Sequence, residues 1–238
     1  MQKVLIVKNK TREGAGLLDA VLEERGLEAD VVDLDKGESF PEATGYAAVF
    51  VLGGPDSAND TSTKMLAELV RVKEILAAGI PYLGICLGLQ VLVKAAGGSV
   101  VKNAVPEIGL RDPDGNRFAV QLTEEGKSDP LFKDLDDPFN VFHLHGETVE
   151  ILLGMTLLAT GKFCENQIVR VGERAYGIQS HFELTDTMFE TWLTEDPDLK
   201  QTDQSVLRAD YAASKESYAQ TGRTLLNNFL DASGACTK

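Results

Sequence analysis

The chain has 238 residues, of which 43% are hydrophobic and 25% charged, and its formal net charge is −14. This composition is that of a globular protein with a buried core, and no apolar run approaches the roughly 18 residues that a membrane helix needs. The acidic residues are scattered along the chain and repel phosphate backbones, which argues against a nucleic-acid partner. We therefore expect neither a membrane nor a nucleic acid as partner.

The number and spacing of the cysteines, together with the N-terminal sequence, predict the cellular compartment of the protein. Cys86, Cys164 and Cys236 stand in unrelated contexts, without the CxxC spacing of a zinc site or the even number of a disulfide framework. The opening MQKVLIVKNK lacks the order of a secretory signal and predicts a core strand instead. We expect a cytoplasmic protein with reduced thiols, no metal and no other cofactor.

Short apolar runs rich in Val, Ile and Leu predict the first strands, each buried on both faces. Their ranges are 3–8, 29–34, 46–52 and 80–85. Between them, apolar residues at helical spacing predict helices over 14–25 and 61–78. Strands that alternate with helices indicate an α/β fold with a parallel sheet and right-handed crossovers.

The pattern changes in the second half of the chain. From about residue 99 to 179, short runs separated by turn residues such as DPDGN (112–116) predict antiparallel strands added to the sheet. After Glu183 the chain is polar, with apolar residues at helical spacing near its end. We expect one domain over residues 1–184, with a helical extension over 185–238 packed on it.

The stretch PYLGICLGLQ (81–90) places Cys86 between a predicted strand and a predicted helix. Gly84 and Gly88 flank it in the G-x-nucleophile-x-G arrangement, which lets a sharp strand-to-helix turn expose its apex side chain. The amino terminus of the following helix favours the thiolate, which is the reactive form of the thiol. Cys86 is thus a candidate nucleophile; the alternative is a small buried hydrophobe.

A base for this nucleophile must be one of three histidines, and the segment GIQSHFELT favours His181. His181 follows an apolar run, and Glu183 stands two residues later. In extended backbone this spacing points both side chains the same way, so the carboxylate can orient the imidazole. Cys86, His181 and Glu183 are therefore a candidate nucleophile, base and orienting acid.

Further motifs accompany these residues: VFVLGGPDS (49–57), PEIGL (106–110) and FHLHGETV (142–149). Together with GICLG and the HFE segment they resemble the class I glutamine amidotransferases of the cysteine-triad type, in particular stand-alone relatives of the GMP synthetase amidotransferase domain. In order and spacing the resemblance covers about residues 1–184. It implies a flavodoxin-like open sheet flanked by helices.

The resemblance also implies a reaction and roles for single residues. Cys86 would attack the side-chain amide of glutamine to give a γ-glutamyl thioester, His181 would protonate the departing ammonia, and water would release glutamate. The backbone N–H groups of Gly54 and Leu87 would bind the oxyanion. The glutamine pocket would be lined by Gly53, Gln90, Leu144 and His145.

Two departures from the family pattern leave alternatives open. Phe182 replaces the proline of the family's HPE-like motif, and we expect this change to loosen the geometry without abolishing activity. No P-loop pattern or other ATP-binding segment occurs, so a synthetase that accepts ammonia would be a separate subunit. The alternatives are a γ-glutamyl peptidase acting on conjugates, another cysteine hydrolase of the wider superfamily, and a non-catalytic regulatory homologue. A homo-oligomer is also possible.

Overall fold

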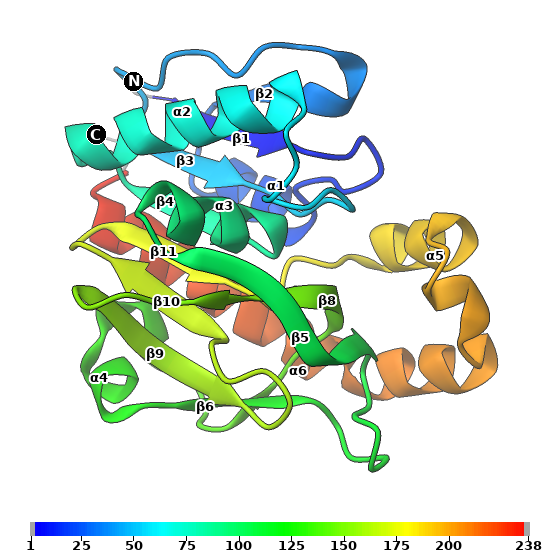
Figure 1. The fold of residues 1–238 in the computed structure, drawn as a ribbon. Helices are drawn as coiled ribbons and strands as arrows, with labels where there is room; N and C mark the ends of the chain where they lie inside the picture. The colour runs from blue at the N-terminus through cyan, green and yellow to red at the C-terminus, as the bar shows by residue number, and fades with distance from the viewer. Residues whose placement is uncertain (1–2, 236–238) are drawn as a thin grey trace.

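The computed structural model describes residues 3–235, so Cys236 lies outside the described residues. Nine strands form one central sheet in the order β2-β1-β3-β4-β11-β10-β9-β6-β7 (Figure 1). The parallel half consists of β1 (Val4–Lys8), β2 (Ala29–Asp33), β3 (Ala48–Val51), β4 (Tyr82–Ile85) and β11 (Ala175–Ile178). The antiparallel half consists of β10 (Ile168–Val171), β9 (Met155–Gly161), β6 (Ala119–Leu122) and β7 (Phe139–Asn140).

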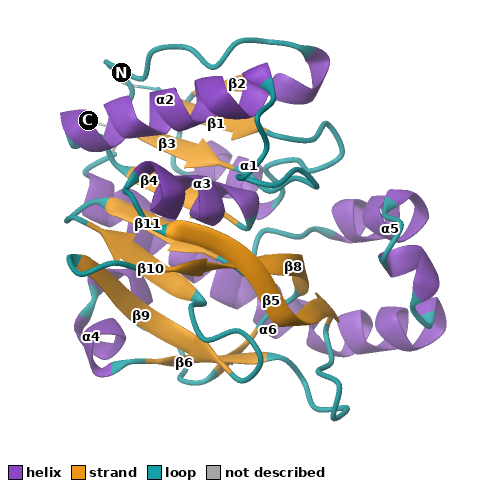
Figure 2. Cartoon of the chain, viewed as in Figure 1, coloured by secondary structure: helices purple, strands orange, loops and turns teal. Residues whose placement is uncertain are grey.

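Two more strands form a separate ribbon. β5 (Ser99–Gly109) pairs antiparallel with β8 (His143–Glu150), and the register shifts between Lys102 and Glu107. The ribbon crosses in front of the central sheet in Figure 2. It places one end of β8 next to the carboxyl end of β4, where Cys86 lies.

Helices cover both faces of the sheet. They are α1 (Leu17–Glu24), α2 (Thr63–Ala78), α3 (Leu87–Ala95), α4 (Glu124–Ser128), α5 (Asp186–Glu195) and α6 (Gln204–Ser233). Short 3-10 helices occur at Leu34–Lys36, Pro130–Phe132 and Leu199–Gln201. Among the described residues, no helix is long and apolar enough to cross a membrane.

Alternation along the strands divides the core between the two faces. Ile6 and Phe50 point to the face covered by α1 and α6, where the rings of Phe50 and Phe229 meet with centroids 5.2 Å apart. Leu5 and Val49 point to the opposite face, which α2 and α3 cover. Strands that are buried on both faces have continuous apolar sequences. Such strands can therefore be predicted from the sequence.

The C-terminal segment reaches around one side of the molecule. α5 and the first part of α6 stand beside the sheet, and the rest of α6 runs behind it (Figure 1). A third apolar cluster joins Trp192 and Phe189 of α5 to Tyr211 of α6 and to Phe142. The segment is thereby anchored next to the carboxyl ends of β4 and β11.

The mostly parallel sheet flanked by helices confirms the predicted fold class, but three strand predictions need correction. β2, predicted to be buried on both faces, is an edge strand in which Val31 is 54% exposed. The strands predicted after residue 99 do not all join the central sheet, because β5 and β8 pair only with each other. In addition, β11 is parallel to β4 rather than antiparallel to all its neighbours. Strand partners depend on the path of the connecting chain, which hydrophobic pattern does not record.

Candidate active site

Cys86 sits at the apex of a strained turn between β4 and α3. Its backbone has φ 52° and ψ −105°, a conformation that non-glycine residues rarely adopt and that costs about 1–3 kcal/mol. A Cβ on Gly84 would overlap the carbonyl of Gly88, and a Cβ on Gly88 would overlap the carbonyl of Val51. The two glycines are therefore required for the turn to close and hold the sulfur at the sheet edge.

The surroundings of the Cys86 sulfur are mainly polar. Cys86 N–H donates to Ile178 O at 2.8 Å, which ties the turn to β11. Gln179 Nε2 lies 3.6 Å from Sγ and Leu144 O lies 3.8 Å from it. Cys86 is 5% exposed, so its sulfur can be approached only through the pocket described below.

His181 and Glu183 form a buried pair next to this sulfur. His181 Nδ1 lies 2.7 Å from Glu183 Oε1, so Nδ1 carries the proton that it donates and Nε2 is left for Cys86. Burial disfavours the charged imidazolium, but the Glu183 carboxylate and the Cys86 sulfur outweigh it and raise the pKa of His181 well above its usual value. The pair therefore holds a protonated imidazole beside the thiol.

Phe182, which takes the place of the proline in the family's motif, forms part of the hydrogen bonding around this pair, and the expected loosening stays a prediction. Its backbone N–H donates to Glu183 Oε2 at 2.8 Å, a hydrogen bond that a proline could not make. His181 N–H donates to Phe142 O at 2.8 Å, and Glu183 O accepts from the N–H of Leu17 at 2.8 Å. These hydrogen bonds tie the segment to Phe142 and to the start of α1.

Two backbone N–H groups are available near Cys86. Gly53 and Gly54 follow the carboxyl end of β3, and Leu87 is the first residue of α3. Neither Gly54 N–H nor Leu87 N–H donates to an acceptor within residues 3–235. Gly54 also lines the pocket described below, whereas Leu87 does not, and an oxyanion site at these two groups stays a prediction.

A pocket of about 400 Å³ opens in front of these groups. Of the residues predicted to form the site, those that line it are Gly54, Cys86, Gln90, Leu144, His145 and His181. Gly53, Leu87 and Glu183 lie behind this lining. Gln90 is 3% exposed, and its Nε2 lies 3.3 Å from both Glu147 O and Gln179 Oε1. Gln90 therefore faces the interior at the pocket wall and not the bulk solvent.

His145 is held by a buried network at the pocket wall. Its Nε2 lies 2.9 Å from Glu107 Oε2 and its Nδ1 lies 3.0 Å from Glu147 O. His143 and Gln167 complete the network, with Gln167 Nε2 donating to Glu107 Oε2 at 3.0 Å. Glu107, His143 and His145 also bring possible metal-ligand atoms within 4.8 Å of one another. Glu107 Oε2 is the atom that His145 Nε2 and Gln167 Nε2 both approach, so this carboxylate links the side chains of the network.

Several residues of the site were not predicted from the sequence. Glu13, Arg12 and Asp196 line the pocket, Trp192 packs on His181, and Gln179 contacts the sulfur. A signal existed for Glu13, because it stands in the loop after the first strand and ligands bind at the carboxyl ends of parallel strands. Asp196 and Trp192 carry no such signal, since only the path of the C-terminal segment brings them here.

Fold and geometry together define the class of protein. A cysteine at a sharp strand-to-helix turn, beside a buried histidine–carboxylate pair at the edge of a parallel sheet, is an arrangement that suits nucleophilic catalysis. Residues 15–197 match the family described as glutamine amidotransferase class-I. The chain belongs to this family.

Individual relatives agree with this assignment. The chain is 30% identical over 189 residues to the glutamine amidotransferase-like protein YfeJ of Salmonella typhimurium, which covers 77% of this chain and 76% of the relative. It is also 30% identical over 195 residues to the GMP synthase [glutamine-hydrolyzing] of Thermosipho melanesiensis. That match covers 81% of this chain but only 35% of the synthase.

Solved structures show the same fold. A glutamine amidotransferase from Thermotoga maritima superposes with a TM-score of 0.85 at 27% identity, covering 97% of this chain and 98% of the other. A glutamine amido transferase from Methylobacillus flagellatus also gives a TM-score of 0.85, over 98% of this chain and 95% of the other, at 21% identity. The C-terminal helices are included in both superpositions.

Proposed function

We propose that the protein hydrolyses the γ-amide of glutamine, or of a related γ-glutamyl amide, through a thioester on Cys86. The observation that carries this proposal is the Cys86–His181–Glu183 arrangement at a pocket of about 400 Å³, beside two backbone N–H groups that have no acceptor within residues 3–235. Membership of the glutamine amidotransferase class-I family supports the same reaction.

In the first half of the reaction the Cys86 thiolate attacks the amide carbon. The N–H groups of Gly54 and Leu87 donate to the oxygen as it becomes an oxyanion, a contribution of about 3–4 kcal/mol per donor in comparable sites. The His181 imidazolium passes its Nε2 proton to the amide nitrogen. The carbon–nitrogen bond breaks, ammonia leaves, and the γ-glutamyl thioester remains.

In the second half, neutral His181 takes a proton from water as the water oxygen attacks the thioester carbon. The carbon–sulfur bond then breaks, glutamate leaves, and the thiolate–imidazolium pair is restored. Glu183 keeps Nδ1 protonated throughout, so Nε2 is always the nitrogen that exchanges the proton. Gln90, Leu144 and His145 are proposed to hold the glutamyl part of the substrate at the pocket wall.

The acceptor of the ammonia is a separate question. GMP synthases are among the relatives, and the chain spans 35% of the length of the Thermosipho melanesiensis enzyme. A synthetase subunit that takes up the ammonia is therefore one proposed partner. A γ-glutamyl conjugate as substrate would instead release an amine and need no acceptor.

The test is release of glutamate from glutamine and from a panel of γ-glutamyl amides by the wild type, Cys86→Ser and Cys164→Ser. Cys164 is the matched control, because it is also buried and burial raises the pKa of its thiol to about 11. We expect turnover that Cys86→Ser abolishes and Cys164→Ser retains. A folded wild type that hydrolyses no substrate would contradict the proposal and favour a regulatory homologue.

A further inference from the structure

Glu13 is a buried carboxylate to which the reaction described above assigns no role. It stands in the loop between β1 and α1, at the carboxyl edge of the sheet, and its backbone N–H donates to Lys10 O at 3.0 Å. The residue is only 6% exposed, yet it lines the pocket. Carboxylates are almost never this buried unless they are paired, so this side chain needs an explanation.

The Glu13 carboxylate lies beside Gly53, as do His181 and Cys86. The position that a Cβ on Gly53 would occupy is 2.5 Å from Glu13 Oε2, 3.0 Å from His181 Cε1 and 3.5 Å from Cys86 Cβ. Three side chains from three different elements therefore converge at Gly53. Only a glycine leaves room for these three side chains. Gly53 is therefore needed for the packing of the site as well as for the turn after β3.

No partner in the protein satisfies this carboxylate. Among residues 3–235, no side chain or backbone group forms a hydrogen bond or ion pair with its oxygens. The nearest cation in sequence, Arg12, is engaged with Asp196, whose Oδ2 lies 2.5 Å from Nη2. Burial raises the pKa of Glu13 to about 7, against the lowering effect of the His181 and Arg12 charges. Near neutral pH a substantial fraction of Glu13 is thus ionised and available to a donor from a ligand.

We propose that Glu13 accepts a hydrogen bond from the departing nitrogen of the substrate and so selects amides over other γ-glutamyl compounds. This assignment rests on the proposed function. Glu13 Oε2 and His181 Cε1 lie 2.5 Å and 3.0 Å from the same point, the position of a Cβ on Gly53, and the Nε2 that delivers the proton to the leaving group is bonded to Cε1. A nitrogen that receives this proton therefore comes within reach of the carboxylate.

The chemistry of the leaving group makes the proposal specific. The amide nitrogen of glutamine carries two hydrogens, and as it takes up the His181 proton it gains positive charge before the carbon–nitrogen bond breaks. A carboxylate that accepts from one of these hydrogens orients the nitrogen and stabilises the charge. The leaving oxygen of a γ-ester carries no hydrogen before protonation, so Glu13 has nothing to accept from it.

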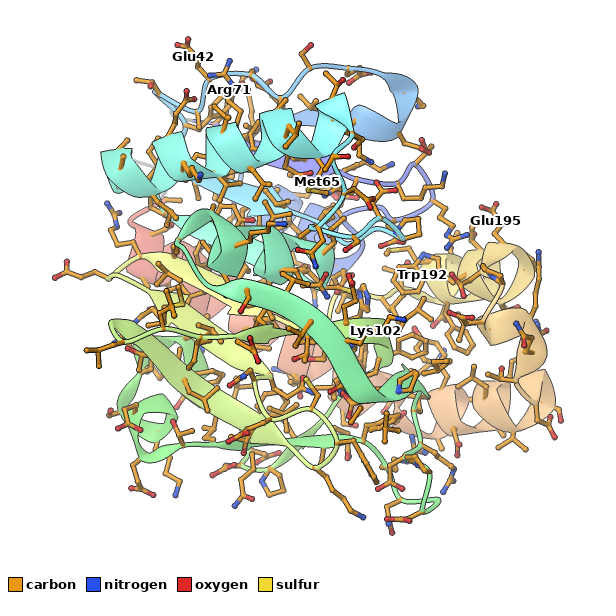
Figure 3. All side chains as sticks on the ribbon, viewed as in Figure 1. Glu42, Met65, Arg71, Lys102, Trp192 and Glu195 are labelled. Carbon is orange, nitrogen blue, oxygen red and sulfur yellow. The ribbon has the colours of Figure 1, made fainter. Side chains whose placement is uncertain are left out.

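The experiment compares kcat/KM for glutamine and for glutamate γ-methyl ester in the wild type, Glu13→Gln and Glu195→Gln. Both substrates form the same thioester, and kcat/KM reports the steps up to its formation. Glu195 is the charge-matched control, because it is exposed and lies on the outer side of α5 (Figure 3). We expect Glu13→Gln to lower kcat/KM for glutamine by about 10- to 100-fold and that for the ester by less than about threefold.

Other outcomes would overturn the assignment. Equal losses on both substrates would show that Glu13 is structural or recognises the glutamyl part, and no loss on either would show that it is not used. Thermal unfolding of each variant separates a folding defect from a loss of selectivity, and Glu13→Asp, with its shorter carboxylate, should fall between wild type and Glu13→Gln. A wild type that hydrolyses neither substrate would overturn the proposed function itself. This result differs from equal losses in Glu13→Gln and from no loss in Glu13→Gln, because both of those require an active wild type.

Discussion

The ring of Trp192 meets the imidazole of His181 edge to face, with centroids 4.8 Å apart and an interplanar angle of 81°. Trp192 is 1% exposed and lies on the side of α5 that faces the rest of the molecule (Figure 3). Its Nε1–H also donates to Arg12 O at 3.3 Å. The C-terminal segment therefore contributes directly to the environment of the proposed base.

Trp192→Phe should lower kcat for glutamine by about 3- to 10-fold and leave KM nearly unchanged, because a smaller ring leaves the imidazole less firmly oriented. The pH dependence of kcat should shift as well, which a purely structural defect would not produce. Phe189→Leu is the control: Phe189 stacks on Tyr211 with centroids 4.0 Å apart and makes no contact of this kind with His181. An equal effect of both variants on kcat would argue against positioning by Trp192.

Glu183→Gln should reduce kcat by about 10²- to 10⁴-fold, because the imidazolium loses the charge that stabilises it and the amide no longer fixes the tautomer. Glu183 raises the pKa of His181, so its loss should move the alkaline limb of kcat/KM to lower pH. The measurement is a pH–rate profile of both proteins. An unchanged alkaline limb would show that Glu183 does not hold His181 protonated.

Gly84→Ala should destabilise the protein by about 3 kcal/mol or more in urea unfolding, since the added Cβ overlaps the backbone of Gly88. Gly14→Ala is the matched control, because no atom lies within 4 Å of the position of its Cβ. We expect that control to stay within about 0.5 kcal/mol of the wild type. Similar stabilities of the two variants would mean that the elbow can open to admit a side chain.

Glu68 makes the stability of the protein depend on pH. Burial raises its pKa to about 7, although Asn9 Nδ2 donates to Oε1 at 2.9 Å. The folded state thus binds this proton more tightly than the unfolded state, so stability should fall as pH rises from about 4.5 to about 7 and then level off. The titration of Glu13, whose pKa is also raised to about 7, should lower stability over the same pH range.

Glu68→Gln should therefore be more stable than the wild type at pH 8 by roughly 2–4 kcal/mol, and the difference should vanish near pH 4. The amide can also donate to Asn9 Oδ1, which has no partner within the described part of the chain. Glu74→Gln, an exposed change on the same helix, should alter stability by less than about 1 kcal/mol. A constant difference across this pH range would show that Glu68 does not titrate near 7.

The sequence by itself determined the features that depend on neighbours in the chain. The strands β1, β3 and β4 are continuous apolar runs. The elbow needs glycines two residues on either side of Cys86. His181 and Glu183 meet because extended backbone points alternate side chains the same way. The strands and the His181–Glu183 spacing follow from periodicity along the chain, and the elbow is recognised as a local motif although the clash at Gly88 is with Val51 of β3.

Tertiary structure alone decided the rest. The loop after β1 and the helix α5 bring Glu13 and Trp192 to the site from distant parts of the chain, and nothing in their flanking residues indicates that they lie near Cys86 and His181. A glutamate in a polar loop is expected to face solvent, and only the packing of Gly53, His181 and Cys86 around it reverses that expectation. The pairing of β5 with β8 has the same origin, since long-range contacts follow from how the whole chain packs.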